Sequence, residues 1–202
     1  MLYRAMQTST TILLVLLNVN VYANAIELGE IIMHKKHMGI EHPIEPAIGI
    51  SKEDRLESIR LLNTILADEN ILYQQTLNYH WNLVGPQFND YHQLFKNGLP
   101  GYEKIFDFID DVAERVATLG GIALGTKAEF VKAATIGEDG DNIPDPRTMV
   151  KRLLDSHEAI IRNVRVAVKK TADTDAGTNN FLTDLMEKHE KAAWMLRALS
   201  ER

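Results

Sequence analysis

The chain contains no cysteine, which excludes disulfides, zinc–thiolate sites and thiol nucleophiles. Its formal net charge is −6, so the chain as a whole offers no polycationic surface for nucleic acid. No segment shows the alternation of apolar and polar residues between turns that is typical of β-strands. What is present, 202 residues of which 45% are hydrophobic, is enough for one helical domain with a substantial core.

The first 25 residues differ in composition from the rest. The opening MLYRAMQTST has one positive charge and no acid, and it is followed by the apolar run TILLVLLNVNVYA and an A-x-A exit at residues 23–25. This three-part pattern predicts a secretory signal peptide over residues 1–25, and therefore export to the periplasm or cell envelope. The run is too short for a membrane span, so none is expected in the mature chain. The alternative is an apolar arm packed on a partner subunit.

Residues 26–50 are interpreted as an N-terminal tail, because they hold two prolines and no sustained periodicity. Two lysines stand against four glutamates, which makes the tail net acidic. His34, His37 and His42 form either a loose metal-binding tract or part of a solvated linker. Nothing in the sequence fixes their geometry, and the linker is favoured.

Four long amphipathic stretches over residues 51–202 predict an all-α bundle. Ser51 and Asp54 provide a start similar to a capping box, and the first stretch ends at Gly85-Pro86. The second runs from about 89 to 119 with a break predicted in KNGLPGYEK, because proline costs about 3 kcal/mol inside a helix. Asp145 and Pro146 begin the third. The segment TKAEFVKAATI predicts a short helix in the long connection between helices two and three, which allows those two helices to run parallel.

Two histidines and a group of acids are the candidate metal ligands. His80 and His92 flank the Gly85-Pro86 turn, and the acids of DFIDDVAERV lie in the second helical stretch: Asp107, Asp110, Asp111 and Glu114. Asp110 and Glu114 are four residues apart and share a helix face, where they repel each other unless a cation lies between them. The alternative is a solvated acidic face. Imidazole and carboxylate together suit iron, manganese or zinc.

The chain has no Glu-x-x-His motif. Two such motifs supply di-iron centres that lie inside a single four-helix bundle, so a centre of that type is not expected here. If the histidines and acids cooperate, they are expected to meet across a subunit interface.

The blocks NYHWN–GP–F, DDVAER…LGG…LGT and HEK–WML resemble the Dps family of ferritin-like mini-ferritins (DNA-binding proteins from starved cells), over about Ile48 to Leu199. The resemblance implies a ferritin-like four-helix bundle and a hollow shell of twelve subunits. It also implies a ferroxidase centre at the twofold interface. There His80 and His92 of one subunit and Asp110 and Glu114 of its mate bind two iron ions, with Trp81 beside them. Such centres oxidise Fe(II), typically with hydrogen peroxide and otherwise with oxygen, and the shell stores a ferric mineral.

The chain departs from the family pattern in three places. Lys96 stands where the family usually carries an acid, four residues after the second histidine. The spacing from His92 to the aspartate is eighteen rather than fifteen, and a strict count of fifteen selects Asp107 and then Asp111. Asp110 and Glu114 are preferred because DDVAER matches the motif and NGLPG can loop out three residues.

The third departure concerns the threefold pore. Asp175 is a candidate pore residue, but Asn180 stands where an acid is common. His157 and His189 lie on or near apolar helical faces and are interpreted as core or interface histidines, and Trp194 is interpreted as a core side chain.

Family members that bind DNA do so largely through basic tails, whereas this tail is acidic and the chain ends in RALSER. No strong DNA binding is therefore expected. Two rival interpretations remain: a shell with a degenerate metal site and a structural or surface role, and a DNA-compacting protein in the cytoplasm, which is the family's usual compartment.

Overall fold

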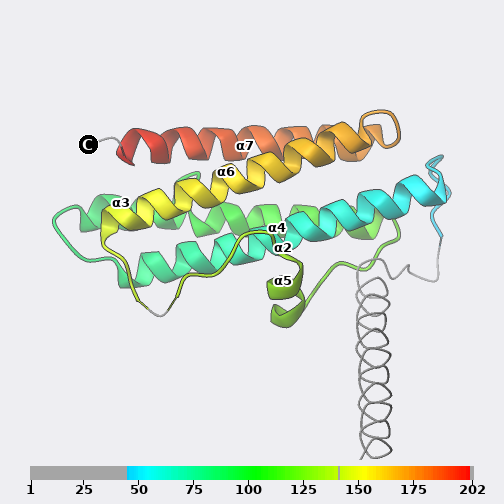
Figure 1. The fold of residues 1–202 in the computed structure, drawn as a ribbon. Helices are drawn as coiled ribbons and strands as arrows, with labels where there is room; N and C mark the ends of the chain where they lie inside the picture. The colour runs from blue at the N-terminus through cyan, green and yellow to red at the C-terminus, as the bar shows by residue number, and fades with distance from the viewer. Residues whose placement is uncertain (1–44, 141, 201–202) are drawn as a thin grey trace, which may run out of the picture. The chain divides into compact units, whose positions relative to one another are not determined.

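The computed structural model describes residues 45–140 and 142–200, and within these ranges it contains helices and no strand (Figure 1). The predicted signal peptide and the three tail histidines lie outside the described residues. The helices are α2 (Lys52–Asn82), α3 (Phe88–Asn97), α4 (Tyr102–Thr118), α5 (Lys127–Ala133), α6 (Pro146–Thr171) and α7 (Ala176–Ser200). The all-α prediction is confirmed. None of the described helices is long and apolar enough to cross a membrane.

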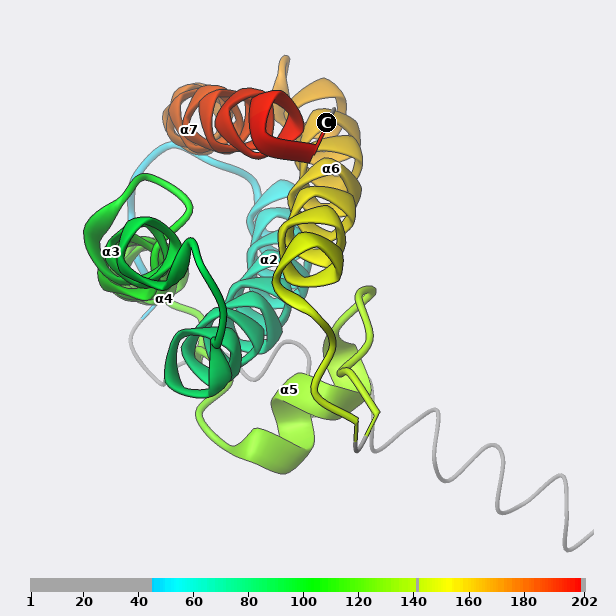
Figure 2. The ribbon, with the colours of Figure 1, turned by 90° about the vertical axis from the view of Figure 1, so that its left-hand side faces the viewer.

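The long helices form a four-helix bundle in which α3 and α4 together make one of the four elements. The α2 helix packs against α4 and α6, and α6 packs along α7 (Figure 2). Helices α4 and α6 run in one direction, while α2 and α7 run in the other (Figure 1). The connection that contains α5 therefore returns along the bundle, as the sequence predicts.

The helix starts follow the capping residues that the sequence contains. The Ser51 hydroxyl accepts the backbone N–H of Asp54 at 3.1 Å, which satisfies a donor that has no partner inside α2. Asp145 caps α6 with Pro146 at its first position, and Thr126 starts α5 with a complete capping box.

A tight turn at residues 98–101 separates α3 from α4, at the break that the sequence predicts. The Gly101 N–H donates to the Gly98 carbonyl at 2.9 Å. A Cβ atom on Gly101 would lie 2.6 Å from the backbone oxygen of Lys96, so no larger residue fits without moving backbone. The first turn of α4 is thereby held directly against the end of α3.

A chain of buried polar side chains links three helices in the bundle core. His189 Nε2 lies 2.7 Å from Glu69 Oε1, and His189 Nδ1 lies 2.9 Å from His157 Nδ1. All three side chains are fully buried, which confirms the core interpretation of the two histidines. Buried polar groups are costly unless they are hydrogen-bonded, so the contacts Glu69–His189–His157 favour the one packing of α2, α6 and α7 that allows them.

Trp194 is not a core residue, and here the sequence interpretation is wrong: its side chain is 62% exposed. The buried stripe of α7 passes through Leu185, His189, Ala192 and Leu196. At 3.6 residues per turn, position 194 falls on the opposite side of the helix from 192 and 196.

The buried histidine chain predicts how stability depends on pH. Burial first, and then the charge on His189, hold the pKa of His157 well below its ordinary value, so the ring stays neutral in the folded protein. An unfolded histidine takes up a proton near pH 6.5. Below that pH the unfolded state binds more protons, and the free energy of unfolding falls as the pH drops from about 7 to about 5. In urea denaturation at these two pH values, the free energy of unfolding is expected to fall less for His157→Leu than for the wild type. An equal fall in both proteins would contradict this assignment.

Candidate metal centre

His80 and His92 lie face to face, on opposite sides of the turn between α2 and α3. Their ring centroids are 3.8 Å apart with an interplanar angle of 22°. Gly85 makes the turn possible, because its φ of +122° is a conformation that residues with a Cβ rarely adopt. Its carbonyl accepts the Phe88 N–H at 3.1 Å, which leads directly into α3.

Each ring is oriented by the backbone of the other residue. His80 Nδ1 lies 3.0 Å from the carbonyl oxygen of His92, and His92 Nδ1 lies 3.2 Å from the carbonyl oxygen of His80. A carbonyl oxygen only accepts hydrogen bonds, so both Nδ1 atoms carry the proton. The lone pair of each neutral ring is therefore on Nε2. A hydrogen bond that fixes the tautomer in this way is typical of metal-binding histidines.

The surroundings of His80 favour the neutral ring. Its side chain is only 8% exposed, and burial is the main cause that lowers its pKa. The hydrogen bond to the His92 carbonyl and the charge of Glu103 raise the pKa of His80, whereas the charges of His92 and Lys96 lower it, and the net direction is downward. A neutral imidazole is the form that binds a metal ion.

Aromatic rings surround the histidine pair. Phe88 stacks on His92 with centroids 4.8 Å apart, and Tyr102 meets the His80 ring edge-on at 5.1 Å. Trp81 follows His80 directly and is 64% exposed. Phe88, which stacks on His92, is 45% exposed, and Val84 in the turn between α2 and α3 is 71% exposed.

The candidate acids lie on the outer side of α4. All four are exposed, whereas the opposite side of the helix is buried: Ile105, Phe108, Val112 and Val116. Asp107 is bound by Lys104 at 3.2 Å. Among the described residues, nothing forms a hydrogen bond or ion pair with the carboxylates of Asp110 and Glu114. Asp107 is thus paired within the subunit, and the choice of Asp110 and Glu114 as ligands stays a prediction.

The acids do not reach the histidines of their own subunit. Over the described ranges, no group of three or more histidine, aspartate or glutamate side chains is arranged to hold a metal ion. Within the described part of one subunit, the two imidazoles and the acids of α4 thus lie at separate places. A site that joins them across two copies of the chain stays a prediction.

Asp175, the predicted pore residue, caps the start of α7. Its side chain is 1% exposed, accepts the Thr178 N–H at 2.9 Å and pairs with Arg115 at 3.0 Å. Burial raises the pKa of Asp175, but the hydrogen bonds from Thr178 and the charge of Arg115 together lower it by more. The net shift of the pKa is downward, so the carboxylate is ionised. This geometry gives Asp175 a structural role, and a role in a pore stays a prediction.

Sequence reasoning missed Glu103, which forms an ion pair with Lys96 at 3.9 Å. It lies beyond the Gly98–Gly101 turn, at the first turn of α4. The signal in the sequence is its spacing: Glu103 precedes Asp110 by seven residues and therefore shares its helix face.

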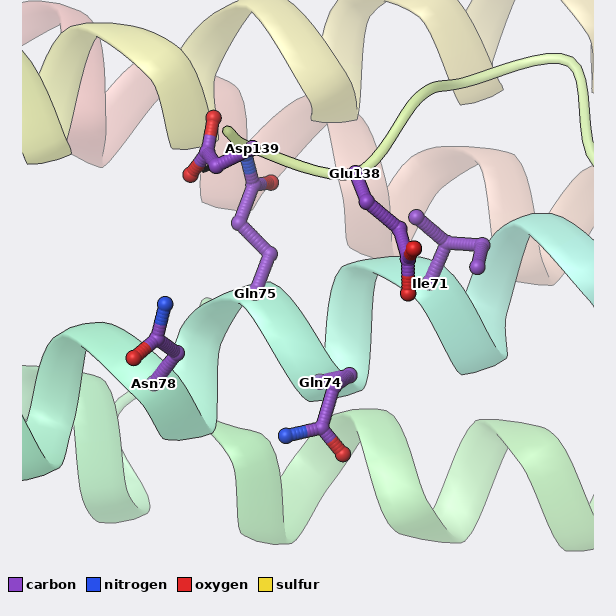
Figure 3. Close-up of a pocket in the computed structure, with 6 residues that line it drawn as sticks. All are labelled: Ile71, Gln74, Gln75, Asn78, Glu138 and Asp139. Carbon is purple, nitrogen blue, oxygen red and sulfur yellow. Dashed lines mark hydrogen bonds between the residues drawn. The ribbon is translucent and has the colours of Figure 1, made fainter. Parts of the chain in front are cut away.

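Tyr79 ties the end of α2 to the connection between α5 and α6. Its hydroxyl donates to Asp139, which also accepts from Arg152 Nη1 at 3.0 Å. Burial, followed by the Asp139 carboxylate, raises the pKa of Tyr79 far above its ordinary value, so the hydroxyl keeps its proton. Figure 3 shows Gln75 pointing toward Asp139 beside a polar hollow of about 180 Å³. The carboxylate of Asp139 is already bonded to Tyr79 and Arg152. These bonds fix α2, the helix that carries His80.

Comparisons with known proteins agree with the helical fold. A model of the ferritin-like domain matches residues 59–202. A low temperature-induced protein of Nostoc sp. is 46% identical over 156 residues, which covers 76% of this chain and 86% of that protein. The DNA protection during starvation protein 2 of Bacillus anthracis is 29% identical and matches over 94% of its length and 69% of this chain.

Solved structures of similar chains have the same fold. DpsC from Streptomyces coelicolor superposes with a TM-score of 0.73 at 31% identity, over 78% of this chain and 91% of that one. A Dps protein from Vibrio cholerae is described as a member of a broad superfamily of ferritin-like diiron-carboxylate proteins. It superposes with a TM-score of 0.71 at 30% identity, over 76% of this chain and 95% of that one. The chain therefore belongs to the Dps family of ferritin-like proteins.

Proposed function

We propose that this protein oxidises Fe(II), the substrate, at centres shared between two subunits and stores the ferric product inside a closed homo-oligomer of twelve subunits. The observation that carries the proposal is the pair of histidines whose Nδ1 atoms are both held by carbonyl oxygens, so that both Nε2 lone pairs are free. Among the described residues of the subunit, no third histidine or acid is already arranged with them to hold a metal ion. Membership of the ferritin-like family supports iron storage and protection from oxidants.

The exposed apolar side chains support the subunit interface. Phe88 stacks on His92, Trp81 follows His80 in sequence, and Phe106 lies on α4; their side chains are 45%, 64% and 58% exposed. A second copy that covers them would bury apolar surface, which favours association. A twofold axis between α2–α3 of one copy and α4 of the other would bring Asp110 and Glu114 of the mate to His80 and His92, and would create two equal centres.

The donor set suits the chemistry. Two imidazoles and two carboxylates provide the mixture of nitrogen and oxygen ligands that iron prefers. Hydrogen peroxide accepts two electrons, one from each of two Fe(II) ions, and yields two hydroxide ions without releasing a radical. Hydrogen peroxide is the oxidant proposed, and oxygen is the alternative.

Variants of the ligands test this function. His80→Ala with His92→Ala, and separately Asp110→Asn with Glu114→Gln, are each expected to lower the rate of Fe(II) oxidation by peroxide to the rate without protein. Asp111→Asn, which removes a neighbouring acid, is expected to retain the rate. The measurement is ferric absorbance after mixing, with assembly checked by gel filtration. A wild-type protein no faster than buffer would instead favour a shell with a degenerate site.

The acidic surface argues against a role in DNA compaction. Non-specific DNA binding depends on lysines and arginines that neutralise phosphates. The chain has a net charge of −6 and its tail is acidic. In a mobility-shift assay at low salt, the assembled protein is expected to leave duplex DNA unshifted. A tight complex that salt dissociates would support the DNA-compacting alternative.

We also propose that the protein acts outside the cytoplasm, in the periplasm or cell envelope. The support is the sequence pattern of residues 1–25, which ends at an A-x-A exit. Peroxide that enters the cell from outside would meet Fe(II) there first.

A further inference from the structure

Glu103 and Lys96 lie at the rim of the histidine pair because of the turn between α3 and α4. Lys96 is four residues after His92 and shares its helix face. The glycines of the turn let α4 begin directly against the backbone of Lys96. Glu103 therefore falls opposite Lys96, with Nζ and Oε1 3.9 Å apart.

The side chains of Lys96 and Glu103 lie close to the histidine pair. Tyr102, the residue before Glu103, contacts the ring of His80 with centroids 5.1 Å apart. Glu103 follows Tyr102 directly, and its carboxylate is 3.9 Å from the ammonium group of Lys96, which lies one helical turn after His92. A carboxylate at this rim is therefore near the place where a metal ion on the two Nε2 atoms would lie.

The pair between Lys96 and Glu103 is weak. Its distance is at the upper end of the range for ion pairs, and the side chains are 45% and 46% exposed. Exposed pairs of this kind contribute little to stability, because water screens them and two flexible side chains must be held in place. A divalent cation bound to the neighbouring imidazoles attracts the carboxylate more strongly than one ammonium group does.

Resting on the proposed function, we propose that Glu103 is a metal ligand from the same subunit as His80 and His92. It replaces the acid that is missing at Lys96, and Lys96 holds it aside until a second metal ion enters the centre. In this proposal the half-exposed side chain of Glu103 turns from Lys96 toward the two imidazoles when the ion binds. The extra residues of the turn thus compensate for the lysine. Each centre then holds two imidazoles and one carboxylate from one subunit and two carboxylates from its mate.

Cobalt(II) titration of the assembled, full-length protein tests the proposal. Co(II) is stable in air and takes the same nitrogen and oxygen ligands as Fe(II). Calorimetry gives the number of ions per subunit and their affinities, and visible absorption reports the ligand set. The wild type is expected to bind two ions per centre. Glu103→Gln is expected to retain one ion and to bind the second at least about tenfold more weakly.

Two further variants and a control complete the experiment. Lys96→Ala is expected to bind the second ion more tightly, because its competitor for Glu103 is gone. The double variant with Lys96→Asp and Glu103→Gln is expected to restore the second ion. Asp90→Asn is the control, because this exposed acid is also close to His92 in sequence but lies on a different side of α3.

The outcomes separate this proposal from the function on which it rests. If the wild type binds Co(II) through His80 and His92, and Glu103→Gln binds both ions unchanged, the role of Glu103 is wrong and the shared centre stands. If Lys96→Ala leaves the second affinity unchanged, the role of Lys96 is wrong. If the wild type binds no more Co(II) than His80→Ala, the proposed function fails as well.

Discussion

The reciprocal hydrogen bonds between His80 and His92 are the interaction on which the site depends. Each Nδ1 donates to the carbonyl of the other residue, so the end of α2 and the start of α3 are locked together by the two side chains themselves. The same two bonds place both Nε2 lone pairs on the open side. Packing, tautomer and metal-binding capacity thus have one cause, because a neutral imidazole that donates from one nitrogen presents the other as a ligand.

The rest of the bundle holds that arrangement in place. Tyr79 is tied to Asp139 on the long connection, which fixes the last turns of α2. Farther along the same helix, Glu69 binds His189 in the core and links α2 to α7. The core histidines His157 and His189 are fully buried and bond to each other and to Glu69, so they orient helices. His80 and His92 instead bond to backbone carbonyls through Nδ1, which leaves Nε2 free for the proposed metal binding.

Much of the fold can be predicted from the sequence, because capping residues and breaks have local causes. Ser51, Asp145 and the glycines near Pro100 predict helix boundaries that the structure confirms. Trp194 is apolar but exposed, because it lies on the side of α7 opposite the buried stripe. Hydrophobicity alone does not give the side of a helix on which a residue lies.

The site is predictable only in part, for a physical reason. The Nδ1 contacts of the histidines depend on the path of the turn, which the spacing of twelve residues allows but does not determine. The contact between Lys96 and Glu103 depends on how α4 begins, and the sequence shows only that the helix must break there. The partnership of His80 with Asp110 depends on a second copy, so its assignment stays a prediction.

The central claim is that each subunit holds two halves of two different centres, and mixing of subunits tests it most directly. Subunits with His80→Ala and His92→Ala are assembled together with subunits that carry Asp110→Asn and Glu114→Gln. With random pairing across a twofold axis, half of the pairs are mixed and each mixed pair regains one intact centre, so about a quarter of the wild-type oxidation rate is expected. A mixture as inactive as either variant alone would contradict the shared centre.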